Sequence, residues 1–328
     1  MTGVALITVL LLAWANGAND NGKGVATLVG SGALSERRAL QLALSSTALG
    51  AVASVLLGAG LLLAFSGKGL VPDSLVGDSS FLLSVGLGAG WTVVGFTWVR
   101  MPVSTTHALV GGLIGAGAAM AGPASIDAAR LAAVFALPLL LSPLAAAVLT
   151  WLFASRVPTR THSPVRAGGE SVVAVQAVSS VARLHIASAA TVSFARGLND
   201  APKIAALLAV TVLPGAGAIA LVAFAMAAGG WFGVQRVTRT ISRDITDMSE
   251  AEGTVANVVT AALVLIASPL GLPVSTTHVS VGAVFGIGVS SGRANTDTVR
   301  AILGAWVVTL PIAAFLAGAC ALVLGAGQ

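Results

Sequence analysis

Two polar motifs occur twice in this chain, once in each half. The first motif reads Gly17-Ala-Asn-Asp20 near the start and Gly197-Leu-Asn-Asp200 in the second half. The second motif reads Pro102-Val-Ser-Thr-Thr-His107 and returns letter for letter as Pro273-Val-Ser-Thr-Thr-His278. All four copies lie inside long apolar stretches, where a carboxylate or a run of hydroxyls costs free energy. Such doubling constrains the fold to two related halves that share one polar site.

The composition predicts an all-α integral membrane protein. Hydrophobic residues make up 56% of the 328 residues and charged residues 9%, whereas a soluble domain carries about 25% charged residues. The short alternating strands of a transmembrane β-barrel are absent from the sequence. The net charge of +5 could suit nucleic acid, but the basic residues follow membrane topology instead. We therefore expect a lipid bilayer and no nucleic acid as a partner.

The apolar segments form two sets of five. A membrane span needs about 20 apolar residues. The candidate segments are 3–34, 39–65, 81–101, 103–121, 130–153, 183–213, 216–235, 254–272, 274–291 and 299–325. A polar stretch rich in proline and arginine separates the two sets. We predict a first repeat at 1–154, a cytoplasmic linker at 155–182 and a second, inverted repeat at 183–328.

The motifs interrupt these segments in two ways. Gly17 and Gly22 flank the first Asn-Asp pair, and Gly197 and Pro202 flank the second, so a broken helix is expected in each half. The third and fourth segments of each half meet at the Pro-Val-Ser-Thr-Thr-His motif without a polar loop. This arrangement predicts a re-entrant hairpin, because non-helical backbone at membrane depth is tolerated where it lines a polar cavity. The expected fold is an inverted-repeat secondary transporter with broken helices and two re-entrant hairpins.

The basic residues predict the orientation. With re-entrant hairpins each half crosses the membrane three times, so the second half is inverted. If the N-terminus lies outside, only Lys68 and Arg130 among the loop residues fall outside, in agreement with the positive-inside rule. The residues that then fall inside are Arg37, Arg38, Arg156, Arg160, Arg166, Arg183, Arg236, Arg239, Arg243, Arg293 and Arg300. We expect a multi-pass protein of the cytoplasmic (inner) membrane, with both termini outside and the linker cytoplasmic.

The Asn-Asp pairs are candidate cation ligands. Asp20 and Asp200 are the two acidic residues deep in apolar sequence, where a carboxylate costs at least about 2.5–3.5 kcal/mol. With Asn19, Asn199 and the carbonyls that a helix break exposes, they would form an all-oxygen site for a small hard cation. Sodium and protons remain equal alternatives for that coupling cation.

A plainer role for the aspartates is to neutralise the lysine three residues later. That lysine is Lys23 in the first half and Lys203 in the second. Ion pairing of this kind could coexist with cation binding. We therefore treat both lysines as candidate accessory residues.

The Ser-Thr-Thr runs are candidate anion ligands. Each run precedes a helix, and the free N–H groups and positive dipole of a helix N-terminus bind anions. Two such tips would enclose a small tetrahedral oxyanion; the alternative is that the hydroxyls only cap their helices. The candidate ligands are Ser104, Thr105, Thr106, Ser275, Thr276 and Thr277. His107 and His278 lie one turn further on, and we expect them to fix the hairpins or sense protons rather than touch the substrate.

These motifs closely resemble those of the inorganic phosphate transporter family, often called PiT, and the likeness covers the chain apart from the linker. The resemblance implies symport of inorganic phosphate with sodium or protons, no cofactor and a homodimer. It also implies that the Asn-Asp pairs serve the cation and that the hydroxyls cradle the anion. The chain departs from the pattern at Arg196, where members often have a small polar residue or His. It departs again at Ala256-Asn257, where many relatives have Glu, so Asn257 is a further accessory candidate.

Three other functions stay open on the sequence. A sulfate permease of the same fold is the main alternative, although phosphate keeps P–OH donors that carboxylates can accept and sulfate has none. An anion channel is disfavoured because two hairpin tips at a midplane site suit alternating access. An enzyme is not expected, because a Ser nucleophile and a His base would not need two identical copies.

Overall fold

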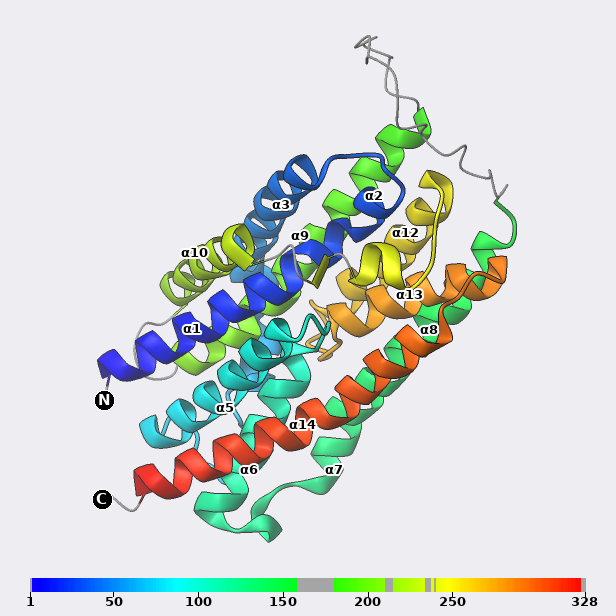
Figure 1. Ribbon diagram of the computed structural model, residues 1–328. Coiled ribbons are helices and arrows are strands. Elements are labelled where there is room, and N and C mark those ends of the chain that lie inside the picture. Colours follow the sequence, from blue (N-terminus) through cyan, green and yellow to red (C-terminus); the bar gives the residue numbers. More distant parts are fainter. Residues whose placement is uncertain (1, 158–179, 210–214, 234–236, 239, 326–328) are drawn as a thin grey trace.

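The computed structural model describes residues 2–157, 180–209, 215–233, 237–238 and 240–325, and these residues are overwhelmingly helical (Figure 1). The first half contains α1 (Thr2–Asp20), η1 (Asn21–Val25), α2 (Ala26–Gly30), α3 (Glu36–Leu57), α4 (Ala59–Phe65), α5 (Ser79–Trp98), α6 (Thr105–Ala121), η2 (Pro123–Ser125), α7 (Ala128–Arg130), η3 (Leu131–Ala136) and α8 (Leu137–Ala154). The second half contains α9 (Ser180–Ala209), α10 (Ala216–Gly233), η4 (Thr240–Asp244), α12 (Glu250–Ala267), α13 (Thr276–Ser291) and α14 (Thr296–Gly325).

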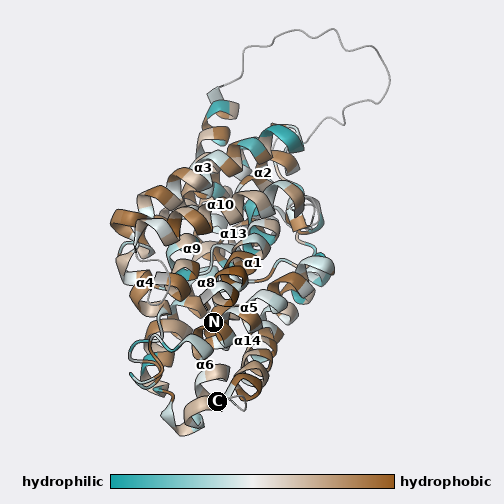
Figure 2. Ribbon diagram, turned by 90° about the vertical axis from the view of Figure 1, so that its left-hand side faces the viewer, coloured by the Kyte–Doolittle hydropathy of each residue, from teal (hydrophilic) through white to brown (hydrophobic). Residues whose placement is uncertain are grey.

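The helices have the length and composition of a membrane protein. Within the described residues, six helical stretches are long and apolar enough to cross a membrane. Figure 2 shows hydrophobic residues along the length of most helices. Large apolar side chains such as Leu140, Leu144 and Phe315 are exposed on the outer helices α8 and α14, as expected for a surface in contact with lipid. The predicted all-α membrane class is confirmed.

The first Asn-Asp motif ends a helix as predicted. The α-helical part of α1 stops at Asp20, and the chain continues as the tighter η1 before it resumes as α2. Gly22 and Gly24 lie in η1, and glycine is a poor helix former because of its backbone freedom.

The prediction of a second broken helix is wrong. α9 runs without interruption from Ser180 to Ala209 and carries Asn199, Asp200 and Pro202 inside it. The physical reason is local composition. The part of α9 after Asp200 contains no glycine, and its run of alanine, isoleucine and leucine after Lys203 favours helix. One proline removes one backbone hydrogen bond, which a long, packed helix can absorb.

Two helix–turn–helix units carry the repeated Ser-Thr-Thr runs. Residues 99–104 join α5 to α6, and residues 268–275 join α12 to α13. The two turns have the same backbone design, because Arg100 and Gly271 both adopt a left-handed conformation, with φ of 63° and 68°. Ser104 and Ser275 are the N-cap residues of the helices that follow.

The two halves are interleaved rather than side by side. α1 packs along α10, α3 along α9, α6 along α14, and α8 along α13. Each of these pairs joins a helix of the first half to a helix of the second. The start of α1 and the end of α14 lie at the same end of the molecule (Figure 1). Most of the predicted linker, together with Arg160, Arg166, Arg236 and Arg239, lies outside the described residues.

Small residues allow the helices of the two halves to approach closely. Gly111 and Gly115 of α6 face the backbone carbonyls of Leu310 and Ala314 on α14. Gly282 and Gly286 of α13 face the carbonyls of α8 in the same way. The glycines after each Ser-Thr-Thr run therefore serve packing, as small residues do between membrane helices.

We expect Gly115→Ala to lower the thermal unfolding temperature of the purified protein in detergent. The added methyl group would collide with the Ala314 carbonyl oxygen, and overpacking of this kind costs about 1–3 kcal/mol. The matched control is Gly95→Ala on α5, where no described atom lies within 4 Å of the new methyl group apart from the adjacent residues and the nearby backbone of α5 itself. Equal unfolding temperatures for the two variants would show that α6 and α14 are not packed as described.

Candidate functional site

Lys23 lies in η1 and connects the two halves through its ammonium group. It donates to Asn19 Oδ1 at 2.7 Å, to the Val103 carbonyl at 2.8 Å and to Thr277 Oγ1 at 2.6 Å. It also forms an ion pair with Asp20. Asp20 and Lys23 are both buried, so this pair is shielded from water.

Lys203 makes the corresponding contacts from α9. Its ammonium donates to Thr106 Oγ1 at 2.9 Å and to the Val274 carbonyl at 2.7 Å, and it lies 3.5 Å from Asp200 Oδ1. Each lysine therefore contacts the last threonine of the Ser-Thr-Thr run in the opposite half. It also contacts the carbonyl of the valine that precedes the Ser-Thr-Thr run of its own half. The expectation that each lysine neutralises the aspartate three residues before it agrees with these contacts.

The hydroxyls of the two tips have divided roles. Ser104 Oγ accepts from the His107 amide at 3.1 Å, and Ser275 Oγ accepts from the His278 amide at 3.3 Å, so both serines cap their helices. The middle threonines approach the carboxylates: Thr105 Oγ1 lies 3.4 Å from Asp20 Oδ2, and Thr276 Oγ1 lies 3.3 Å from Asp200 Oδ2. All six hydroxyl residues are buried, and the structure brings them into one cluster with both aspartates.

Asn19 and Asn199 hold the two turns. Asn19 Nδ2 donates to Thr97 Oγ1 at 2.8 Å and to the Met101 carbonyl at 3.2 Å. Asn199 Nδ2 donates to the Val274 carbonyl at 3.2 Å, and Ser268 donates to its Oδ1 at 3.1 Å. In this conformation the asparagines thus connect each Asn-Asp motif to the hairpin of its own half.

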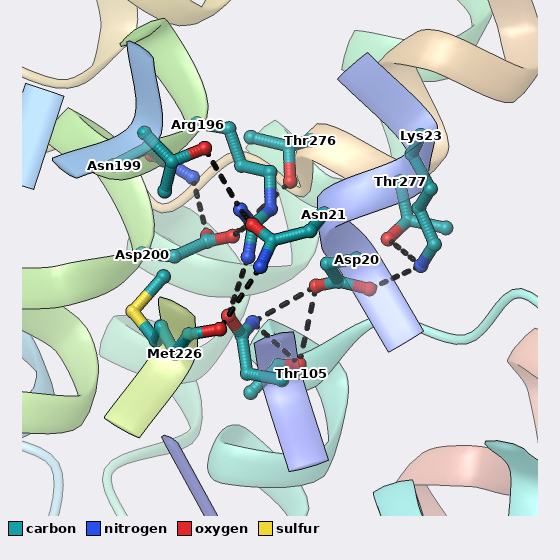
Figure 3. Close-up of polar contacts among 12 residues, drawn as sticks. Asp20, Asn21, Lys23, Thr105, Arg196, Asn199, Asp200, Met226, Thr276 and Thr277 are labelled. Atoms are coloured by element: carbon teal, nitrogen blue, oxygen red, sulfur yellow. Dashed lines mark hydrogen bonds and ion pairs between the residues drawn. The ribbon is translucent and has the colours of Figure 1, made fainter. Parts of the chain in front are cut away.

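Arg196 was not among the candidate site residues predicted from the motifs, but the structure places it in the cluster. Its guanidinium donates through Nη2 to Asn16 Oδ1 at 2.7 Å, and through Nη1 to Thr47 Oγ1 at 3.2 Å and to Asn21 Oδ1. Its Nε lies 3.7 Å from Asp200 Oδ2. Figure 3 shows this side chain between Asp200 and the residues of α1 and η1. Arg196 therefore joins the second carboxylate to the first helix break.

Asn16 completes the connection between the carboxylates. Its Nδ2 donates to Asp20 Oδ2 at 2.9 Å and to Thr105 Oγ1 at 3.0 Å, while its oxygen accepts from Arg196. Asn16 and Arg196 both lie four residues before the aspartate of their own motif. An alignment of the two motifs extended by one residue toward the N-terminus would have indicated both residues. Thr47 lies outside every motif, and no sequence pattern identifies it.

The histidines lie between the two tips. The rings of His107 and His278 have centroids 4.4 Å apart, and His278 stacks on Trp306 at 3.7 Å. Trp306 in turn donates through Nε1 to the Pro102 carbonyl at 3.0 Å. These contacts agree with the expectation that the histidines fix the hairpins.

Asn257 belongs to a separate group of contacts. Its side chain accepts from Thr27 at 3.0 Å and donates to Ser188 Oγ at 3.1 Å. It therefore connects α12 to α2 and α9. These two partners lie outside the cluster of aspartates, lysines and tips, unlike those of the other accessory candidates.

The charges of the cluster favour an anion. Three buried basic side chains, Lys23, Arg196 and Lys203, accompany the two buried carboxylates of Asp20 and Asp200. In their ordinary charge states these groups leave one positive charge in excess. The N-termini of α6 and α13 add partial positive charge at the same place. Carboxylate, amide and hydroxyl oxygens within the cluster are also ligands of the kind that sodium prefers.

Comparison with known proteins gives one consistent family. Residues 16–317 match the model of the phosphate transporter family. A Mycobacterium bovis protein named "Probable low-affinity inorganic phosphate transporter" is 31% identical over 94% of this chain and 74% of its own length. A Pyrococcus furiosus protein named as a candidate phosphate permease is 28% identical over 96% of this chain and 95% of its own.

A solved structure has the same fold. It is described as "The sodium-dependent phosphate transporter", and it superposes with a TM-score of 0.84 and 25% sequence identity over 99% of both chains. Together with the match across nearly the whole sequence, this similarity leads to one conclusion: the chain belongs to the phosphate transporter family.

Proposed function

We propose that this protein carries inorganic phosphate across the cytoplasmic membrane together with a cation, sodium or a proton, by alternating access. The observation that carries the proposal is the pairing of two Ser-Thr-Thr tips with a lysine from the opposite half: Lys23 with Thr277 at 2.6 Å and Lys203 with Thr106 at 2.9 Å. Phosphate transport also agrees with the names of the relatives and of the structural neighbour.

The anion site of this proposal lies between the two tips. The ligands are the N-termini of α6 and α13, the lysine ammonium groups and the six hydroxyl residues from Ser104 to Thr106 and from Ser275 to Thr277. An incoming phosphate takes the place of the lysine–threonine hydrogen bonds, because its oxygens accept from ammonium and hydroxyl groups alike. The excess positive charge of the cluster offsets part of the desolvation cost of the anion.

The carboxylates favour phosphate over sulfate. Phosphate keeps one or two P–OH donors near neutral pH, whereas sulfate has none. Asp20 and Asp200 lie within 3.4 Å of the middle threonines of the tips, where a carboxylate can accept from a P–OH group and repels a fully ionised anion.

The coupling cation of this proposal binds at Asp20 and Asp200, with oxygens of Asn19 and Asn199. These oxygens are held by Lys23, Ser268 and the hairpin turns in the described conformation, so the cation binds after the cluster opens. Sodium is favoured over the proton because the structural neighbour is described as sodium-dependent.

In the proposed transport cycle the chain acts as two inverted repeats, and the helix–turn–helix units are re-entrant hairpins. The 17 residues of α6 and the 16 residues of α13 reach about 25 Å at 1.5 Å per residue, less than the roughly 30 Å of a bilayer core. A pocket of about 430 Å³, lined by Gly22, Arg37 and Trp231 among others, reaches the first helix break. Arg37 is one of the residues predicted to face the cytoplasm, so this pocket is the proposed cytoplasmic route. Both termini lie outside in this scheme, and the functional unit is a homodimer.

We expect reconstituted protein to accumulate labelled phosphate against its gradient when a cation gradient is imposed. Unlabelled phosphate should compete more strongly than sulfate, because only phosphate has P–OH groups that can donate to the carboxylates. The measurement is uptake into proteoliposomes at fixed pH, with and without sodium. Stronger competition by sulfate would favour a sulfate permease, and ohmic currents without accumulation would favour a channel.

We expect Thr277→Val and Thr106→Val each to raise the phosphate concentration for half-maximal uptake roughly 10- to 100-fold. Each change removes a hydroxyl that would bond a charged ligand, worth about 1.5–3 kcal/mol. The control is Thr150→Val on α8, a buried threonine whose hydroxyl has no hydrogen-bond partner among the described residues. Unchanged half-saturation in both tip variants would refute the assignment of these hydroxyls to the anion.

We expect Asp20→Asn and Asp200→Asn each to abolish cation-driven uptake while the protein still folds. The neutral amide keeps the shape of the side chain but loses the charge that attracts a cation. Uptake is measured with the cation gradient present and absent, and folding is checked by thermal unfolding and monodispersity in detergent. Near-normal driven uptake in both variants would contradict a role for the carboxylates in coupling.

A further inference from the structure

Arg196 and Asn16 occupy equivalent positions in the two motifs but differ in charge. Each lies four residues before its aspartate, one helical turn away. Asn16 donates an amide hydrogen bond to Asp20, whereas Arg196 brings a guanidinium to within 3.7 Å of Asp200. The second motif therefore has a permanent cation where the first has a neutral amide.

The guanidinium fills a pocket of oxygen atoms. Its neighbours are Oδ1 of Asn16, Oδ1 of Asn21, Oγ1 of Thr47 and Oδ2 of Asp200. The orientation of both amides is fixed from the other side, because Asn16 Nδ2 donates to Asp20 and Asn21 Nδ2 donates to the Met226 carbonyl at 2.9 Å. Both amide oxygens consequently accept from Arg196, and Figure 3 shows Asn21 beside the guanidinium.

This pocket has the chemistry of a sodium site. Two amide oxygens, a hydroxyl and a carboxylate are hard oxygen ligands, and together they carry one negative charge. A small monovalent cation would satisfy the same atoms if the guanidinium were removed. With 1% of its surface exposed, Arg196 excludes both water and a mobile ion from this place.

We propose that Arg196 is a tethered cation that takes the place of one mobile coupling cation at Oδ2 of Asp200. Each transport cycle then carries one cation fewer than it would with a mobile cation in the guanidinium pocket. Oδ1 of Asp200, which faces Asn199, stays available to the coupling cation of the proposed function. The proposal rests on the cation-coupled phosphate transport proposed above and concerns its stoichiometry. A fixed positive charge returns with the protein at the end of every cycle, whereas a bound sodium ion or proton is released on the other side.

The test is the net charge moved per phosphate. Wild-type protein and two variants are reconstituted in proteoliposomes, the membrane potential is set with potassium and valinomycin, and the potential at which labelled phosphate flux stops is measured. Arg196→Asn gives both motifs the same residue and leaves the oxygen pocket vacant. Its charge per phosphate should be larger than the wild-type value by one, while Arg196→Lys should keep the wild-type value. An unchanged value in Arg196→Asn overturns the proposal, because a purely structural arginine would change the rate and not the charge.

A second measurement tests the proposal even if Arg196→Asn does not fold. Thr47→Val in the wild-type background removes one oxygen from the pocket and leaves the guanidinium in place. The concentration of coupling cation for half-maximal uptake should stay within about twofold of wild type, since no mobile cation uses that oxygen. A tenfold increase would show that a mobile cation binds there and would overturn the proposal. Absence of phosphate uptake by the wild type would reject the proposed function itself, whereas uptake with unchanged charge in Arg196→Asn rejects this inference alone.

Discussion

Two aspartates, two lysines and one arginine lie buried in one cluster of the described residues, and the arrangement of the helices around them depends on the need to compensate their charges. Asp20, Asp200, Lys23, Arg196 and Lys203 are each at most 4% exposed. An unpaired charge in such a place costs several kcal/mol even after relaxation of its surroundings. Compensation here comes from both halves of the chain, because Lys23 reaches Thr277 and Arg196 reaches Asn16 and Asn21. Ion pairs form within each half, but the hydrogen bonds that complete the compensation cross between the halves, in agreement with their interleaved packing.

The lysine ammonium groups bind at the hairpin turns because backbone carbonyls and hydroxyl groups there can accept hydrogen bonds. Carbonyls at the turns have no intrahelical partner, and the Val103 and Val274 carbonyls each accept from a lysine ammonium. The same ammonium groups bind the last threonine of the opposite tip. Each lysine thus joins three elements at one point: its own motif, its own hairpin and the opposite hairpin. This geometry keeps the cluster closed in the described conformation.

The sequence predicts much of the site because the motifs repeat. Two related halves must place equivalent motifs in equivalent positions, so the convergence of both aspartates with both Ser-Thr-Thr runs follows from the repeat itself. The partners of each residue do not follow, because contacts such as Lys203 with Thr106 depend on how the halves dock. The continuous helix α9 also differs from the expected break, since packing and the alanine-rich sequence after Lys203 compensate for Pro202. In the sequence, Arg196 is noticeable only as a departure from a family pattern. Its bridging contacts with Asn16, Asn21 and Thr47 are known only from the structure.

The shared lysines suggest how binding of an anion could be linked to binding of a cation. In the described conformation, the ammonium of Lys23 divides its contacts between Asp20 and Thr277. An anion at the tips attracts that ammonium and weakens its pairing with Asp20, which raises the affinity of the carboxylate for another cation. Thermodynamic linkage requires the reverse as well, so a cation at Asp20 releases Lys23 toward the anion. In the second half Arg196 also compensates the charge of Asp200. If Lys203 moves away, Asp200 therefore keeps a basic neighbour, whereas Asp20 loses its ion pair when Lys23 moves away. Linkage of this kind should therefore be stronger in the first half, where a neutral asparagine stands in place of the guanidinium.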